Sequence, residues 1–235
     1  MKHTAVLIFF LLLSTKIFSQ EKFCESYNCQ STIDFFEGII NVLGKKAEKF
    51  NVNQQEIVSI LAPELTMFIY NNKFNIDFVE TSAAELFYVK MGSDYGNFSL
   101  GYFQMKPLFI EKIEDELRKD SILNKKYKHL IEYELGFNVR HLRIKRIKDL
   151  EWALDYANAF YEITSKKLST NAMDPVERVK LLATAYNRGF EENLQEINRW
   201  INRKHFPRCF SCSEKFAYSE IALYYYDYFS TINRF

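Results

Sequence analysis

Glycine and proline are scarce in this sequence, with 7 and 4 residues among 235. A protein built from short strands and tight turns uses many such chain-breaking residues, so a strand-rich architecture is disfavoured. Aromatic residues are abundant instead, with 22 phenylalanines and 15 tyrosines. Few chain breakers and many large apolar side chains favour long packed helices, and we expect an all-α fold.

The sequence also lacks an excess of charge of either sign, since 31 Lys and Arg residues stand against 30 Asp and Glu residues. Binding to nucleic acid depends on a basic face, so we expect no nucleic-acid partner. One local basic run occupies residues 140–148. We interpret it as a solvated helix face, with contact to an anionic polymer as the alternative.

The one marked apolar run is too short to span a bilayer, which takes about 20 residues. It covers residues 5–13, follows Lys2 and precedes a small residue, Ser19. This order is typical of a cleaved export signal. We therefore expect residues 1–19 to be a signal peptide and residues 20–235 to form a single domain, exported to the periplasm or the cell exterior. After cleavage we expect no stable membrane span; an uncleaved anchor is the alternative.

Only four cysteines are present, namely Cys24, Cys29, Cys209 and Cys212. An even number in an oxidising compartment indicates disulfides, and the sequence does not choose among the three possible pairings. One attractive possibility ties the N-terminal segment to the C-terminal one. Zinc is the less favoured interpretation, because 180 residues separate Cys29 from Cys209. We expect no metal and no other cofactor.

Apolar residues recur at helical spacing through most of the sequence. Asn53 with Glu56 has the pattern of a capping box, Asp174 and Pro107 suit helix starts, and Gly189 suits a helix end. Between residues 71 and 101 we also expect a small hairpin or irregular lobe. The expected helices cover residues 31–50, 53–70, 82–91, 106–119, 147–168, 174–190, 191–201 and 219–229.

One acidic residue interrupts the apolar face of the second helix. Glu64 lies four residues after Ile60 and seven after Ile57. A carboxylate in that position is costly unless it is paired or neutral, and burial raises the pKa of a carboxyl group. A general acid needs such an environment to hold its proton near neutral pH. The alternative is a Glu at the edge of the stripe in a salt bridge.

Two further runs carry side chains suited to binding sugars, "SLGYFQMKP" at residues 99–107 and "ATAYNRGF" at residues 183–190. The order is a Glu on a helix, then G-x-x-Q, then A-Y-N-x-G. This order resembles the soluble lytic transglycosylases and the related goose-type lysozymes. The resemblance spans residues 53–200, and it implies a lysozyme-like helical domain with a groove.

The resemblance also implies a function, the cleavage of peptidoglycan between N-acetylmuramic acid and N-acetylglucosamine. Glu64 would be the single acid and base, and the products would be 1,6-anhydro-muropeptides. The implied partners are peptidoglycan strands, and further envelope proteins could also bind. Glycine would allow close approach of a sugar, the amides would bind its polar groups, and a tyrosine would orient the acid. The implied substrate-binding residues are Gly101, Tyr102, Phe103, Gln104, Tyr186 and Asn187.

Some residues depart from the family pattern. Leu65 follows Glu64 where the family has Ser, and 37 residues separate Glu64 from Gly101, more than the family's usual spacing. Glu80 is therefore the alternative acid, and Glu85 is interpreted as a surface residue. A hydrolytic lysozyme would need a second carboxylate, for which Asp94 is the candidate. Two competing hypotheses remain. One is a non-catalytic glycan-binding protein, and the other is a partner-binding module whose cysteine pairs hold a metal ion.

Overall fold

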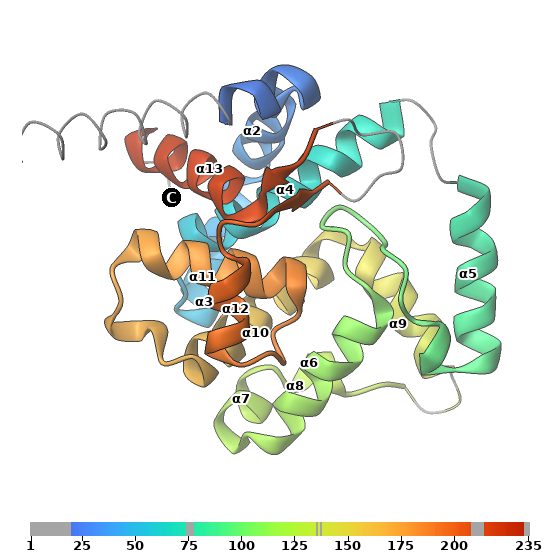
Figure 1. The fold of residues 1–235 in the computed structure, drawn as a ribbon. Helices are drawn as coiled ribbons and strands as arrows, with labels where there is room; N and C mark the ends of the chain where they lie inside the picture. The colour runs from blue at the N-terminus through green and yellow to red at the C-terminus, as the bar shows by residue number, and fades with distance from the viewer. Residues whose placement is uncertain (1–19, 74–77, 135, 137, 208–213, 233–235) are drawn as a thin grey trace, which may run out of the picture.

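A computed structural model describes residues 20–73, 78–134, 136, 138–207 and 214–232, with only the backbone described for residues 78–81. Helices dominate, as Figure 1 shows, so the expected all-α class is confirmed. The expected signal peptide, Cys209 and Cys212 lie outside the described residues. Within the described ranges, no helix has the length and apolar character needed to cross a membrane.

The elements follow one another with short connections. A helical stretch over residues 20–27 comes first. The helices of the first half are α2 (Cys29–Gly38), α3 (Ile40–Phe50), α4 (Gln54–Lys73), α5 (Phe78–Met91), the 3-10 turn η1 (Ser93–Tyr95), α6 (Pro107–Lys119), α7 (Ser121–Lys126) and α8 (Lys128–Ile131). The rest are α9 (Val139–Lys148), α10 (Leu150–Lys167), η2 (Thr170–Ala172), α11 (Pro175–Arg188), α12 (Leu194–Trp200), the antiparallel strands β1 (Lys204–Phe206) and β2 (Phe216–Ala217), and α13 (Tyr218–Ile232).

Helix α4 is the centre of the fold. Side chains around its whole circumference are buried from Gln54 to Met67, apart from the half-buried Gln55 and Glu64. Helices α13, α11 and α2 pack on it, and α10 and α3 close another side (Figure 1). Because α4 is covered on all sides, a polar side chain in its middle must face either a partner or a cavity.

The expected helix ends agree with the structure at several positions. The Asp174 carboxylate accepts a hydrogen bond from the N–H of Val176 at 2.9 Å, and Pro107 is the first residue of α6. The backbone N–H of Glu56 donates to Oδ1 of Asn53 at 3.2 Å, which is one of the two bonds of the expected capping box. The Glu56 carboxylate accepts from the side-chain amide Nδ2 of Asn53 at 3.1 Å, where a capping box would use the backbone N–H of Asn53. Local side-chain chemistry therefore determines where these helices begin.

One expectation about secondary structure is wrong, and a second is confirmed only in part. The helix expected over residues 31–50 is two helices, α2 and α3, because the chain leaves helical geometry at Ile39 (φ −109°, ψ 15°). In the region between residues 71 and 101, where a hairpin or irregular lobe is expected, residues 92–101 are irregular apart from η1, whereas α4 runs to Lys73 and α5 covers Phe78–Met91. The described strands β1 and β2 pair near the C-terminus.

The basic run at residues 140–148 forms α9, but its arginines are not all solvated. Arg143 is buried and donates hydrogen bonds to Glu114 at 2.8 and 3.1 Å. Arg146 stacks on Trp152 and Tyr133, with 4.1 and 4.2 Å between the guanidinium carbon and each ring centroid. The interpretation as a solvated face is therefore wrong for these two side chains, whose partners come from α6, α10 and the loop at Tyr133.

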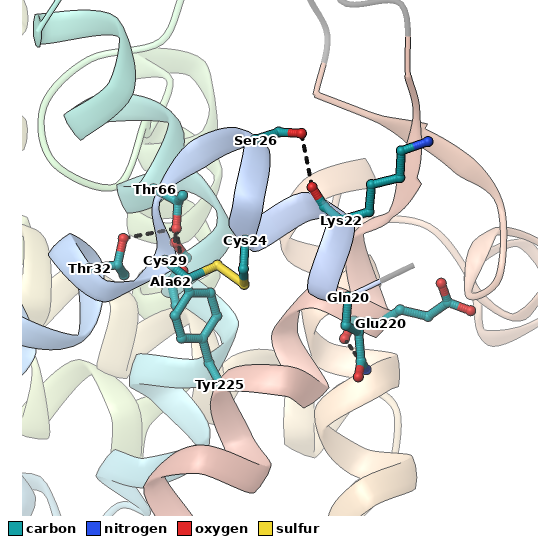
Figure 2. Close-up of a disulfide and its surroundings, with 10 residues drawn as sticks. All are labelled: Gln20, Lys22, Cys24, Ser26, Cys29, Thr32, Ala62, Thr66, Glu220 and Tyr225. Atoms are coloured by element: carbon teal, nitrogen blue, oxygen red, sulfur yellow. Dashed lines mark hydrogen bonds between the residues drawn. A yellow bond between two sulfur atoms is a disulfide. The ribbon is translucent and has the colours of Figure 1, made fainter. Parts of the chain in front are cut away.

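A disulfide links the helical stretch over residues 20–27 to α2, and a chain of hydroxyl groups joins α2 to the core. Cys24 and Cys29 form the disulfide that Figure 2 shows, so neither cysteine ties the N-terminal segment to the C-terminal one. Thr66 of α4 is hydrogen bonded to Thr32 of α2 at 2.9 Å and to Tyr225 of α13 at 2.6 Å. These buried contacts fix α2 against α4 and α13.

Candidate active site

A cavity of about 320 Å³ opens beside the middle of α4. Its walls come from α4, the segment before α6, α6 itself, the end of α11 with the loop after it, and the end of β1. Amide and hydroxyl groups line much of it, contributed by Asn71, Asn97, Ser99, Gln104 and Asn187. Such neutral polar groups bind hydroxyl and acetamido groups well, because each can both donate and accept hydrogen bonds.

Glu64 reaches this cavity from the central helix. Its side chain is half-buried, and its carboxylate Oε1 accepts a hydrogen bond from the amide Nδ2 of Asn187 at 3.2 Å. Met67 and Asn71, three and seven residues further along α4, line the cavity with it. The polar position expected within the apolar face of this helix therefore faces a cavity.

The turn before α6 presents Gln104 to the cavity. Leu100 and Met105 pair across it through two backbone hydrogen bonds of 2.9 and 3.0 Å. Gln104 has a left-handed backbone (φ 50°), and its amide Nε2 donates to the carbonyl of Gly101 at 3.0 Å. The amide is thus held at the wall of the cavity by its own turn.

Gly101 has a role other than the expected one. Its φ is 68°, and a Cβ at this position would lie 2.4 Å from the carbonyl oxygen of Ile147 at the end of α9. Glycine is therefore required so that the turn can pack on α9. The expected close approach to a sugar ring is not what the backbone needs here, and Gly101 is not among the residues that line the cavity.

Tyr102 and Phe103 also belong to the packing of the turn. Phe103 is fully buried and stacks on Phe36 of α2 with 6.3 Å between ring centroids. Tyr102 is half-buried between Phe35 and Phe68, at 5.4 and 5.3 Å. Neither residue lines the cavity, so the expectation that they bind substrate there is not supported by their positions.

Tyr186 and Asn187 stand side by side at the end of α11, and both line the cavity. The Tyr186 hydroxyl donates a 2.7 Å hydrogen bond to the carbonyl of Phe103, so this donor is directed at the turn. Burial and then the nearby charge of Glu64 raise the pKa of Tyr186 well above its ordinary value. Its hydroxyl therefore stays protonated and keeps its role as a donor.

The alternative acids occupy other places. Glu85 of α5 forms an ion pair with Lys148 at 2.5 Å, and Asp94 is an exposed residue of η1. Neither lines the cavity. Glu80 lies on α5, and its side chain is outside the described part of the structure.

Several charged groups at the cavity are not predicted from the sequence. Lys106 donates to Asn97 at 2.7 Å, Lys112 is ion-paired with Glu191, and Arg188 stacks on Trp200 at 4.2 Å. No local pattern marks these residues, because the partners of Lys112 and Arg188 come from other segments and Lys106 bonds to a residue nine positions away. Asn71 and Met67 could have been found from their helical spacing to Glu64.

This arrangement can supply a carboxyl group for proton transfer and amides for holding a sugar. Among the described residues, no cluster of three or more His, Cys, Asp or Glu side chains could hold a metal ion.

In comparisons with protein-family models, with curated proteins and with solved structures, the chain matches none.

Proposed function

We propose that this protein is an exported peptidoglycan lytic transglycosylase with Glu64 as its single acid and base. The observation that supports this most is the meeting of three segments at one cavity. Glu64 from α4, Gln104 from the turn before α6 and Asn187 from α11 all line it. These are three of the residues to which the resemblance assigns a role, and they are separated by 40 and 83 positions in the sequence.

In the proposed reaction, Glu64 first acts as the acid. Its proton passes to the glycosidic oxygen as the bond from C1 of N-acetylmuramic acid to that oxygen breaks. The resulting carboxylate then takes the proton of the C6 hydroxyl of the same sugar, while O6 bonds to C1. One anhydro sugar and one free 4-hydroxyl are formed, and no water is consumed.

The described lining of the cavity favours a mechanism that uses a single carboxylate. The common glycosidase mechanisms need a second one, either to activate water or to attack the sugar. Among the described residues at the cavity, Glu191 is the only other acid, and it is ion-paired with Lys112. Asp94, the expected second carboxylate of a hydrolytic lysozyme, is exposed on η1 and away from the cavity lining.

The test is digestion of purified peptidoglycan by residues 20–235 and by the Glu64→Gln variant, with products identified by mass spectrometry. We expect anhydro-muropeptides from the wild type and a rate loss of about 10²-fold or more in the variant. Glu85→Gln is the matched control, because it removes an acid that is paired with Lys148 away from the cavity. It should keep the wild-type rate.

Different results would contradict the proposal in distinct ways. Products heavier by one water would mean a hydrolytic lysozyme. An active Glu64→Gln variant would move the acid to Glu80. Binding to peptidoglycan without any product would mean a glycan-binding protein, and the cavity would then be its recognition site.

A further inference from the structure

Asn187 joins Glu64 to a histidine that lies across the cavity wall. While its Nδ2 donates to Oε1 of Glu64 at 3.2 Å, its Oδ1 lies 2.7 Å from Nε2 of His205 on β1. The other ring nitrogen of His205, Nδ1, lies 2.8 Å from the backbone carbonyl oxygen of Arg203. A continuous line of hydrogen bonds therefore runs from α4 through α11 to the hairpin.

The donors and acceptors along this line determine the proton count. The carbonyl of Arg203 only accepts, so Nδ1 of His205 must carry a hydrogen. The amide donates through Nδ2 to a carboxylate, so its Oδ1 faces His205 and also only accepts. Nε2 must then carry a hydrogen as well. A histidine with both ring nitrogens protonated is an imidazolium, so this orientation of the amide pairs a charged His205 with an ionised Glu64.

The opposite orientation of the amide pairs the opposite charges. If Oδ1 faced Glu64, the carboxyl group would have to be protonated in order to donate to it. Nδ2 would then face Nε2 of His205, which would have to be unprotonated in order to accept. The two orientations thus differ in the protonation of both end groups. We propose that Asn187 couples the protonation of His205 to that of Glu64, and that His205 is a positioning residue for the acid.

Coupling of this kind suits a group that acts as acid and then as base. When Glu64 releases its proton, the orientation with a charged His205 supplies a polarised N–H to the new carboxylate. His205 is half-buried, so it exchanges protons with solvent. The catalytic part of this inference rests on the proposed function, whereas the coupling between the two side chains does not.

Other charged and titratable groups surround the two ends. Trp200 of α12 contacts His205 edge-on at 5.0 Å, and Arg188 of α11 and Arg203 stack on the faces of Trp200. These two guanidinium groups oppose a charge on His205, and the carboxylate of Glu64 favours it. Tyr186 of α11 and Tyr218 of α13 interact electrostatically with Glu64. The charged groups that share the cavity with Glu64 are Lys112 of α6, Lys106 of its preceding loop and Glu191 of the loop after α11.

The coupling is tested by NMR titration of the His205 imidazole in the wild type and in Glu64→Gln, without any glycan. We expect the titration midpoint of His205 to fall by about half a pH unit or more in the variant, because one nearby negative charge is lost. Glu191→Gln is the matched control, since it removes the second acid of the cavity and should leave the midpoint near the wild-type value. Equal midpoints in wild type and Glu64→Gln would overturn the coupling.

The positioning role is tested by the pH profile of peptidoglycan cleavage in two variants. His205→Gln keeps a donor for Asn187 but does not titrate, whereas His205→Phe keeps a ring and has no donor. We expect His205→Gln to retain most of the rate and to move the alkaline limb of the profile upward, and His205→Phe to lose about tenfold or more. Rates and pH profiles equal to those of the wild type in both variants would overturn this role.

The two proposals fail in different ways. A shift of the His205 midpoint in a protein that cleaves no glycan would leave the coupling standing and remove the proposed enzyme. Cleavage by the wild type with no change in the His205 midpoint would leave the enzyme standing and remove the coupling.

Discussion

The hydroxyl of Tyr186 donates a 2.7 Å hydrogen bond to the backbone carbonyl of Phe103, and both groups are buried. This contact joins the last turn of α11 to the turn that carries Gln104. Tyr186 also meets Phe160 of α10 edge-on at 5.2 Å, which fixes its ring. One side chain therefore holds two walls of the cavity together.

We expect Tyr186→Phe to lower the free energy of unfolding by about 1–3 kcal/mol, because the buried carbonyl of Phe103 loses its donor. Since the raised pKa keeps this hydroxyl protonated, the loss should be the same at pH 6 and pH 9. Urea unfolding at both pH values measures it. Tyr95→Phe is the control, as Tyr95 is 48% exposed, and its effect should stay within about 0.5 kcal/mol. A Tyr186→Phe variant with the same free energy of unfolding as the wild type would mean that this contact adds no stability.

Gly101→Ala is expected to destabilise the protein strongly. The new Cβ would lie 2.4 Å from the carbonyl oxygen of Ile147, and the left-handed backbone adds about 1–2 kcal/mol of strain. Gly136→Ala separates the two causes, because Gly136 has φ 88° and a Cβ there would meet nothing within 4 Å. We expect Gly101→Ala to cost at least about 2 kcal/mol more than Gly136→Ala in urea unfolding. Equal losses would show that backbone strain alone requires glycine at position 101.

The sequence carries the information for helix ends more fully than for the cavity. Asp174, Pro107 and Asn53 act on backbone groups within three residues, so their effects can be read locally. Glu64 could be singled out for the same reason, because its own helix makes it a polar residue in an apolar face. These features need no knowledge of what packs where.

The rest depends on contacts between distant segments. The sequence shows Gly101 as a glycine in a turn, but its reason is the carbonyl of Ile147 on another helix. Phe103 is an ordinary aromatic residue until α2 places Phe36 against it. His205 is isolated in the sequence because its partner Asn187 comes from α11. Such roles arise from tertiary packing, which periodicity does not encode.

The pairing of Cys24 with Cys29 predicts a specific disulfide-linked peptide. Digestion without reduction, followed by mass spectrometry, should yield a single peptide or linked pair that contains both residues. We expect the double variant Cys24→Ser, Cys29→Ser to lose about 2 kcal/mol of stability, since the closed loop is short. Ser26→Ala, which alters an exposed residue within that loop, is the control and should be nearly neutral. A link from Cys24 to Cys209 or Cys212 would contradict the pairing.

Asp155 of α10 connects this helix to α3 and α8. Its carboxylate pairs with Lys46 at 2.6 Å and with His129 at 2.8 Å. Burial raises the pKa of Asp155, but the hydrogen bonds from His129 and Lys46 outweigh it, so the pKa lies below its ordinary value. A carboxyl with a lowered pKa stabilises the fold above its unfolded pKa, and this stability is lost as the pH falls through its folded pKa.

We therefore expect stability to fall as the pH drops below about 4, with part of that fall due to Asp155. Asp155→Asn should lower the free energy of unfolding at pH 7 by about 1–3 kcal/mol, because Lys46 would lose its buried partner. The variant should also lose less stability than the wild type between pH 5 and pH 2. Urea unfolding across this range measures both effects, and Asp94→Asn on the exposed η1 is the control. An Asp155→Asn curve parallel to that of the wild type would mean that other carboxylates cause the acid sensitivity.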